Sequence, residues 1–268
     1  MNLTKLLGIT MCFLVFHISN AQEKLNYENI NYYNDIDAKG TKCKECLLDI
    51  YIPEGKSSFP VVVWFHGGGL TVGDKKIPDM LKGRGVAIVS ANYRLSPNVK
   101  APVYIEDAAA AVAWTFKNIK KYGGDPQQIY ISGHSAGGYL SAMIGLDEHY
   151  LKKYNISTKE IAGLIPFSGQ MITHFTIRQE QGIGALQPTI DQYAPIHFLK
   201  KDSPRILLFT GDKEKELFGR YEENAYMHRM MKLNGHQDIL LYELQGYNHN
   251  NMVEPGIPLM INWIFKKD

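Results

Sequence analysis

Apolar positions along the chain fall into short continuous runs that alternate with longer stretches of helical period. Residues 60–66 and 86–93 are runs rich in β-branched side chains, which is the pattern of strands buried on both faces. Further strands are predicted at residues 47–52, 129–133, 161–167, 205–210 and 239–244. Helices are predicted at residues 101–121, 136–146, 221–233 and 257–266.

The alternation of strands and helices defines the expected fold class. Apolar strands separated by helices predict an α/β fold with a mostly parallel central sheet and helices on both faces. The strands before residue 60 are expected to form an antiparallel edge. Residues 169–203 lack clear periodicity, and long irregular stretches in compact domains are commonly functional lids. We therefore expect one domain with a small lid insertion over its functional site.

The first 21 residues have the three-part pattern of a secretory signal peptide. Lys5 supplies positive charge, residues 6–18 form a nearly unbroken apolar run, and residues 19–21 place small side chains at a cleavage site. The apolar run is shorter than the ~20 residues that a membrane-spanning helix needs. We expect cleavage after Ala21 and a secreted or periplasmic domain of residues 22–268, with no membrane span after cleavage.

The net charge and the cysteines of the chain argue against a nucleic-acid partner and against a metal site. The formal net charge is +2, with no basic block, whereas a nucleic-acid partner would require clustered positive charge. Cys43 and Cys46 have C-x-x-C spacing, but a zinc site would need two more ligands and no second pair exists. A thioredoxin-like pair would begin a helix, whereas this pair precedes a predicted strand. We expect an edge-strand disulfide or two ordinary thiols, and no metal.

Residues 133–137, Gly-His-Ser-Ala-Gly, fit the pattern G-x-S-x-G between a predicted strand and a predicted helix. A serine on such a sharp turn projects its hydroxyl clear of the sheet, and small neighbours are needed because the turn leaves no room for larger ones. Ser135 is therefore predicted to be a nucleophile.

Residues 66–69, His-Gly-Gly-Gly, follow the buried strand at residues 60–66. Acyl transfer needs donors aimed at the oxygen that becomes negative, and glycines let backbone N–H groups approach it. The predicted oxyanion-hole donors are Gly67, Gly68 and the backbone N–H of Ala136.

A nucleophilic serine in this kind of fold is followed along the chain by an acid and then a histidine. His249 lies in a loop after the last predicted strand, where its imidazole could reach Ser135, and is the predicted base. The acid is expected after the strand at residues 205–210, where Asp212, Glu214 and Glu216 are all available.

Several motifs in a fixed order carry a family resemblance. They are LDIYIP (48–53), HGGG (66–69), NYRLSP (92–97), YGGDP (122–126), GHSAGGYL (133–140) and GYNH (246–249). The chain from about residue 47 resembles the α/β-hydrolase fold carboxylesterases of the hormone-sensitive-lipase-like group. It is most similar to the branch of small bacterial acetyl and feruloyl esterases that act on plant polysaccharides.

The resemblance implies hydrolysis through an acyl-enzyme, with no cofactor. It also implies that the acid comes three residues after the glycine that ends its strand, which is Glu214, with Asp212 as the alternative. The family more often has Asp at this place, so the chain departs from the commonest pattern.

The expected function is that of a serine esterase with a Ser-His-Glu triad, acting on short-acyl esters of a small molecule or an oligosaccharide. Arylformamidases share the fold and the same motifs, so an amide hydrolase is the alternative, although the export signal favours an ester outside the cytoplasm. A peptidase is disfavoured by the HGGG loop. A non-catalytic binding protein of this fold would generally lack a triad member, and all three are present here.

Overall fold

Eight strands form one sheet in the computed structural model, which describes residues 26–34, 43–55 and 57–266. The strands are β1 (Asn26–Asn31), β2 (Leu47–Tyr51), β3 (Phe59–Phe65), β4 (Ala87–Ala91), β5 (Gly124–His134), β6 (Gly163–Phe167), β7 (Ile206–Gly211) and β8 (Ile239–Leu244). Their spatial order is β1-β2-β4-β3-β5-β6-β7-β8. Strands β3 to β8 are parallel, whereas β1 and β2 form the predicted antiparallel edge.

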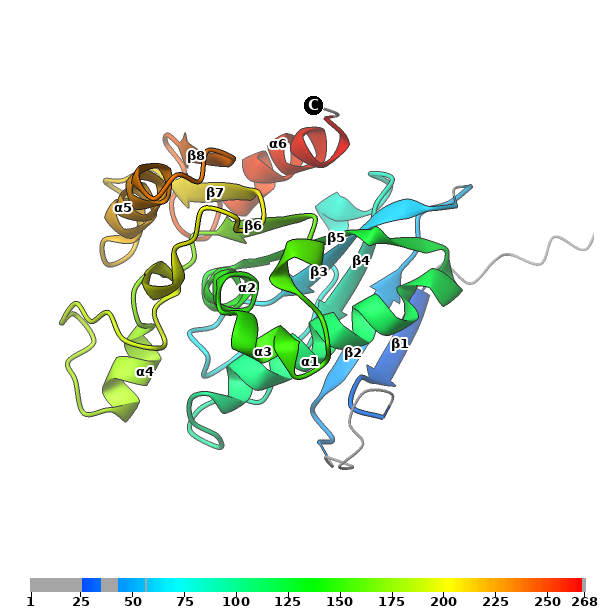
Figure 1. Cartoon of the computed structure of the whole chain (residues 1–268), viewed down its shortest axis with the longest axis horizontal. Helices are drawn as coiled ribbons and strands as arrows, with labels where there is room; N and C mark the ends of the chain where they lie inside the picture. Colours follow the sequence, from blue (N-terminus) through cyan, green and yellow to red (C-terminus); the bar gives the residue numbers. More distant parts are fainter. Residues whose placement is uncertain (1–25, 35–42, 56, 267–268) are drawn as a thin grey trace, which may run out of the picture.

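Helices cover both faces of this sheet (Figure 1). The α-helices are α1 (Val103–Asn118), α2 (Ala136–Leu146), α3 (Glu148–Lys152), α4 (Phe175–Glu180), α5 (Arg220–Leu233) and α6 (Val253–Phe265). Helices α1, α2, α3 and α5 contribute to the core on one face, and α6 packs on the other. The mostly parallel sheet with helices on both faces confirms the predicted fold class.

Strand β3 shows how the sequence produces this two-sided core. Val61, Val63 and Phe65 belong to the core under α1 and α2, whereas Val62 and Trp64 belong to the core under α6. Successive strand side chains point to opposite faces, so a strand covered on both sides must be apolar at every position. Burying each of these side chains contributes about 1.5–3 kcal/mol.

The main differences from the predicted elements lie at their ends. Strand β5 begins five residues before the predicted start, at Gly124. Helix α6 begins at Val253, four residues before its predicted start. Pro255 lies in the first turn of α6. A proline is tolerated there, because the amide hydrogen that it lacks has no partner within the helix, so the helix can begin before this proline.

Residues 169–203, the predicted insertion, contain α4 and pack against the elements that surround Ser135. The Thr176 hydroxyl donates to the Gly69 carbonyl oxygen, and the Tyr139 hydroxyl of α2 donates to the Tyr193 carbonyl oxygen at 2.8 Å. The segment therefore borders the loop that follows β3.

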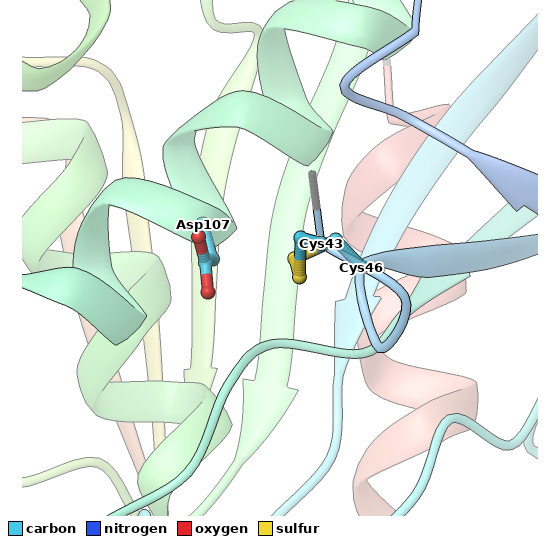
Figure 2. A group of neighbouring side chains, drawn as sticks. All are labelled: Cys43, Cys46 and Asp107. Atoms are coloured by element: carbon cyan, nitrogen blue, oxygen red, sulfur yellow. A yellow bond between two sulfur atoms is a disulfide. The ribbon is translucent and has the colours of Figure 1, made fainter. Parts of the chain in front are cut away.

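Cys43 and Cys46 form a disulfide in the turn before β2. Figure 2 shows this disulfide beside Asp107, which projects from α1. Both thiols are used by the disulfide, and Asp107 accepts hydrogen bonds from Tyr33 and from the guanidinium of Arg94. The cluster is thus a structural link between the edge of the sheet and α1.

The predicted signal peptide lies outside the described residues. Among the residues that are described, no helix combines the length and the apolarity needed to cross a bilayer.

Candidate active site

Ser135 occupies the turn between β5 and α2. Its backbone φ of 57° and ψ of −113° lie in a region that residues other than glycine seldom adopt. A Cβ added to Gly133 would lie 2.5 Å from the Phe65 carbonyl oxygen, and one added to Gly137 would lie 2.0 Å from it. Only glycine fits on either side of this turn, which holds Ser135 at the carboxyl end of the central strands.

The glycine run after β3 lies directly beside this turn. A Cβ added to Gly67 would lie 3.4 Å from the Cβ of Ser135, so the two backbones are in close contact. Gly68 has a φ of +109°, and a Cβ there would lie 1.9 Å from the Val72 carbonyl oxygen. Glycine at these positions is what allows the loop to approach the serine.

His66 fixes the start of the glycine run. Its ring stacks on Tyr93 with centroids 4.4 Å apart, and its Nδ1 lies 2.7 Å from the Gly67 carbonyl oxygen, to which it donates. The Tyr93 hydroxyl donates to the His66 carbonyl oxygen at 2.9 Å. Burial lowers the pKa of His66, so this imidazole is a neutral structural donor at neutral pH.

His249 lies in the loop after β8, beside the residue that precedes Ser135. His134 Nε2 is 2.7 Å from the His249 carbonyl oxygen, and the two ring centroids are 4.7 Å apart. His249 is itself buried. The fold thus gathers the predicted serine, histidine and glycine run at one end of the sheet.

Glu216 is the carboxylate that pairs with His249. Its Oε2 accepts a hydrogen bond from His249 Nδ1 at 2.9 Å, and the exposed fractions of the two side chains are 2% and 7%. The backbone amides of Gly211 and Leu217 also donate to this carboxylate, at 2.8 Å and 3.0 Å. When Nδ1–H is donated to Glu216, the lone pair of the imidazole is on Nε2.

The prediction that Glu214 pairs with His249 is wrong. After β7 the chain makes a tight turn, in which the amides of Lys215 and Glu216 both donate to the Asp212 carbonyl oxygen. The turn brings Glu216 back over Gly211, whereas Glu214 is exposed to solvent. The spacing implied by the family resemblance placed the acid three residues after Gly211, and the turn moves the inward position two residues further along.

Asp212, the alternative acid, has a different set of partners. Its carboxylate accepts from the amides of Gly246 at 2.8 Å and Glu214 at 3.0 Å, and its own amide donates to the Tyr247 carbonyl oxygen at 2.8 Å. The hydrogen bonds from Gly246 and Glu214 lower the pKa of Asp212. Asp212 therefore joins the loop after β7 to the loop that carries His249.

Ser168, directly after β6, contacts both members of the pair. Its Oγ lies 2.9 Å from His249 Nδ1 and donates to Glu216 Oε2 at 3.0 Å. The backbone φ of Ser168 is 48°, and the guanidinium of Arg220 donates to its carbonyl oxygen. Burial lowers the pKa of Arg220 to about 10, so it remains cationic at neutral pH, close to the carboxylates of Glu223 and Glu216.

Two shifted pKa values describe the charge state of the site. Burial acts to raise the pKa of Glu216, but hydrogen bonds from His249 and from the Gly211 amide outweigh it and lower the pKa from 4.5 to about 2. Burial, followed by repulsion from His249, lowers the pKa of His134 to about 4. At neutral pH the site contains an ionised Glu216 and an uncharged His134.

Glu216 is one of the three carboxylates that the sequence leaves open as the acid, whereas no role was predicted for Ser168 or His134. A usable signal existed for Ser168, which directly follows the predicted strand at residues 161–167. Side chains at the carboxyl ends of neighbouring parallel strands gather at one edge of the sheet, where such folds bind ligands. The contact of Glu216 depends on a turn that loop composition did not reveal.

Two solved structures share the fold. A truncated form of a carbohydrate esterase from gut microbiota aligns with a TM-score of 0.74 and 21% identity, covering 90% of this chain and 95% of that chain. A thermophilic esterase from Thermogutta terrifontis aligns with a TM-score of 0.64 and 22% identity, covering 81% and 87%. Together with the strand order, these likenesses define the α/β-hydrolase fold.

Sequence relatives of known name align with part of this chain. Carboxylesterase NlhH from Mycobacterium tuberculosis is 38% identical over 97 residues, which is 34% of this chain and 30% of that protein. The rice (Oryza sativa subsp. japonica) protein "Probable isoprenylcysteine alpha-carbonyl methylesterase ICMEL1" is 27% identical over 233 residues, 76% of this chain and 54% of that protein. The matches therefore span about half of these relatives or less.

The strand order and these likenesses in fold make the chain an α/β-hydrolase in architecture, and the curated relatives that it resembles are named as esterases. The family model named BD-FAE matches residues 48–225, and the chain belongs to this family.

Proposed function

We propose that the protein is a serine esterase in which Ser135 is the nucleophile, His249 the general base and Glu216 the acid that orients His249. The observation that carries the proposal is the buried 2.9 Å hydrogen bond between His249 Nδ1 and Glu216 Oε2. Membership of the BD-FAE family and the similarity to a relative named as a carboxylesterase support it. The assignment keeps the Ser-His-Glu type of triad expected from the sequence, with Glu216 in place of Glu214.

The reaction follows from the protonation states of these groups. His249 Nε2 takes the proton of the Ser135 hydroxyl as its oxygen attacks the ester carbonyl, and Glu216 stabilises the imidazolium that forms. The backbone N–H groups of Gly67, Gly68 and Ala136 stabilise the negative oxygen of the tetrahedral intermediate. His249 then protonates the leaving alcohol, and a water molecule hydrolyses the acyl-enzyme with His249 again acting as base.

The proposed substrates are short-acyl esters, among them acetyl or feruloyl groups on plant polysaccharides. The likeness in fold to a carbohydrate esterase from gut microbiota supports a carbohydrate ester. The insertion at residues 169–203 is short, which leaves little chain to enclose a long acyl group.

We further propose that the enzyme acts outside the cytoplasm, after cleavage behind Ala21. N-terminal sequencing of the exported protein should then begin at Gln22.

The test is a substrate screen on the mature protein with p-nitrophenyl esters of increasing acyl length, acetylated and feruloylated xylan fragments, and an aryl formamide. We expect C2 to C4 esters to be preferred and the formamide to be a poor substrate. Ser135→Ala should lower kcat at least ~10³-fold and abolish labelling by a fluorophosphonate. Ser141→Ala is the matched control, since the Ser141 hydroxyl only donates to the Gly138 carbonyl oxygen within α2.

Each part of the proposal has its own contrary outcome. More than a tenth of the wild-type activity in folded Ser135→Ala would rule out the nucleophile. A preference for the formamide would replace the esterase assignment, and a preference for C10 or longer esters would rule out the short-acyl assignment.

A further inference from the structure

We infer that His134 is a positioning residue that holds the main chain of His249 in place for Ser135, an inference that rests on the proposed function. The contact that carries it is the hydrogen bond from His134 Nε2 to the His249 carbonyl oxygen, 2.7 Å long. A carbonyl oxygen can only accept, so Nε2 of His134 carries the hydrogen.

The other contacts of His249 show what this bond adds. Glu216 and Ser168 hold the Nδ1 edge of the ring, at 2.9 Å each. Contacts at Nδ1 fix the direction in which the ring points. They do not fix the position of the His249 main chain, from which the ring projects. His134 supplies that second fixed point, because it binds the carbonyl group of His249 itself.

The hydrogen bonds elsewhere in this loop lie on either side of His249. Asp212 accepts from the Gly246 amide and donates its own amide to the Tyr247 carbonyl oxygen. The Asn248 side chain accepts from the amides of Asn250 and Asn251. The His134 bond therefore secures the central peptide of the loop, between these two groups of contacts.

The place of His134 in the chain makes the bond relevant to catalysis. His134 is the last residue of β5, and Ser135 follows it in the strained turn. A bond from this residue to His249 links the nucleophile's turn directly to the loop of the base. His134 also faces the glycine run, since its Nδ1 would lie 3.3 Å from a Cβ added to Gly67.

The electrostatics agree with a neutral hydrogen-bond donor in this position. Burial and the proximity of His249 lower the pKa of His134 to about 4. His134 is therefore uncharged at neutral pH, and it does not place a second full positive charge beside His249 when the latter takes the serine proton.

The test compares His134→Gln, which retains an N–H donor close to the position of Nε2, with His134→Ala and His134→Leu, which do not. We expect kcat to fall by about 10-fold or more in the Ala and Leu variants, with KM changed less than about twofold, since small misplacements of catalytic groups cost this much. His134→Gln should recover most of that loss. His236→Ala is the matched control, because His236 is also buried and its ring nitrogens lie against the carbonyl oxygens of Lys201 and Asp238, away from Ser135.

A second measurement does not require a variant. The ¹⁵N resonances of the His134 ring in the wild-type protein at pH 7 should show the neutral tautomer with hydrogen on Nε2. The Nδ1–H tautomer would overturn the inference, because Nε2 would then be unable to donate to the His249 carbonyl oxygen.

The kinetic outcomes separate this inference from the proposed function. If Ser135→Ala abolishes esterase activity but folded His134→Ala keeps kcat within twofold of wild type, the inference fails and the proposed function stands. An equal loss of kcat in His134→Ala and folded His134→Gln would also overturn it, because the donor would then make no difference. If Ser135→Ala remains active, the proposed function itself fails.

Discussion

Glu216 and His249 are 33 residues apart in the chain and share a buried hydrogen bond of 2.9 Å. Glu216 follows β7, and His249 follows β8, the neighbouring parallel strand. Loops that leave the same end of adjacent parallel strands are neighbours in space, so the topology of the sheet brings the two side chains together. The turn after Gly211 then selects which carboxylate of its loop faces His249.

The first prediction concerns that selection. Glu216→Gln should lower kcat at least ~10²-fold with KM nearly unchanged, because removing the orienting charge disturbs the tautomer and orientation of the imidazole. Glu214→Gln should lower kcat less than threefold, as expected for an exposed loop residue. Steady-state kinetics on p-nitrophenyl acetate measures both. A severe loss in Glu214→Gln together with a mild one in Glu216→Gln would contradict the pairing of Glu216 with His249.

The second prediction concerns the stability of the fold at acid pH. The pKa of Glu216 is about 2 in the folded protein, compared with its ordinary value of 4.5. A carboxylate with a lowered pKa stabilises the folded state above its unfolded-state pKa, and this stabilisation is lost as the pH falls from about 4.5 to about 2. The urea concentration at half-unfolding should therefore fall more between pH 5 and pH 2.5 in the wild type than in Glu216→Gln. Parallel pH dependences in the two proteins would show that Glu216 makes no such contribution.

The third prediction concerns the glycine run. Gly68→Ala should lower kcat at least ~10²-fold, the scale seen when an oxyanion donor is lost, because the added Cβ would lie 1.9 Å from the Val72 carbonyl oxygen. Gly55→Ala is the control, since Gly55 also has a positive φ, of +65°, but a Cβ there meets nothing within 4 Å. Both variants carry backbone strain, but only the Cβ added at residue 68 meets a neighbouring atom, and only residue 68 belongs to the glycine run beside Ser135. Equal kcat values in the two variants would indicate that the loop can move away without loss of function.

Much of the fold followed from the sequence because its central strands are apolar on both faces. In β3 every residue is buried, and its short β-branched run predicts a strand. The ends of elements were less predictable, since the proline at residue 255 is compatible both with a loop and with the first turn of α6.

The candidate site was predictable where a residue type is required by backbone geometry. The turn around Ser135 excludes larger neighbours at residues 133 and 137, and this requirement appears directly as glycine in the sequence. The acid is under no such constraint. Glu214 and Glu216 are chemically identical, and the difference between them arises from the backbone amides that donate to the Asp212 carbonyl oxygen, which any residue except proline can supply.

The last prediction concerns Ser168, whose hydroxyl contacts both Glu216 and His249. A hydrogen bond to a charged group contributes about 1.5–3 kcal/mol, so removal of the hydroxyl should lower kcat by about 10-fold or more if Ser168 helps to hold the pair. In Ser168→Ala the hydroxyl is lost while the backbone strain at the φ of 48° stays the same, because serine already carries a Cβ there. Ser168→Gly removes the same hydroxyl at a residue that tolerates this conformation, and we expect a similar loss of kcat.

The control for Ser168 is Ser132→Ala. The Ser132 hydroxyl is also buried and donates to the Ile165 carbonyl oxygen at 2.6 Å, but it lies within the sheet. Its removal should lower the melting temperature while kcat changes less than about twofold. If Ser168→Gly retains the kcat of the wild type, then Glu216 and the loop of His249 hold the imidazole without Ser168. The hydroxyl of Ser168 would then serve packing alone.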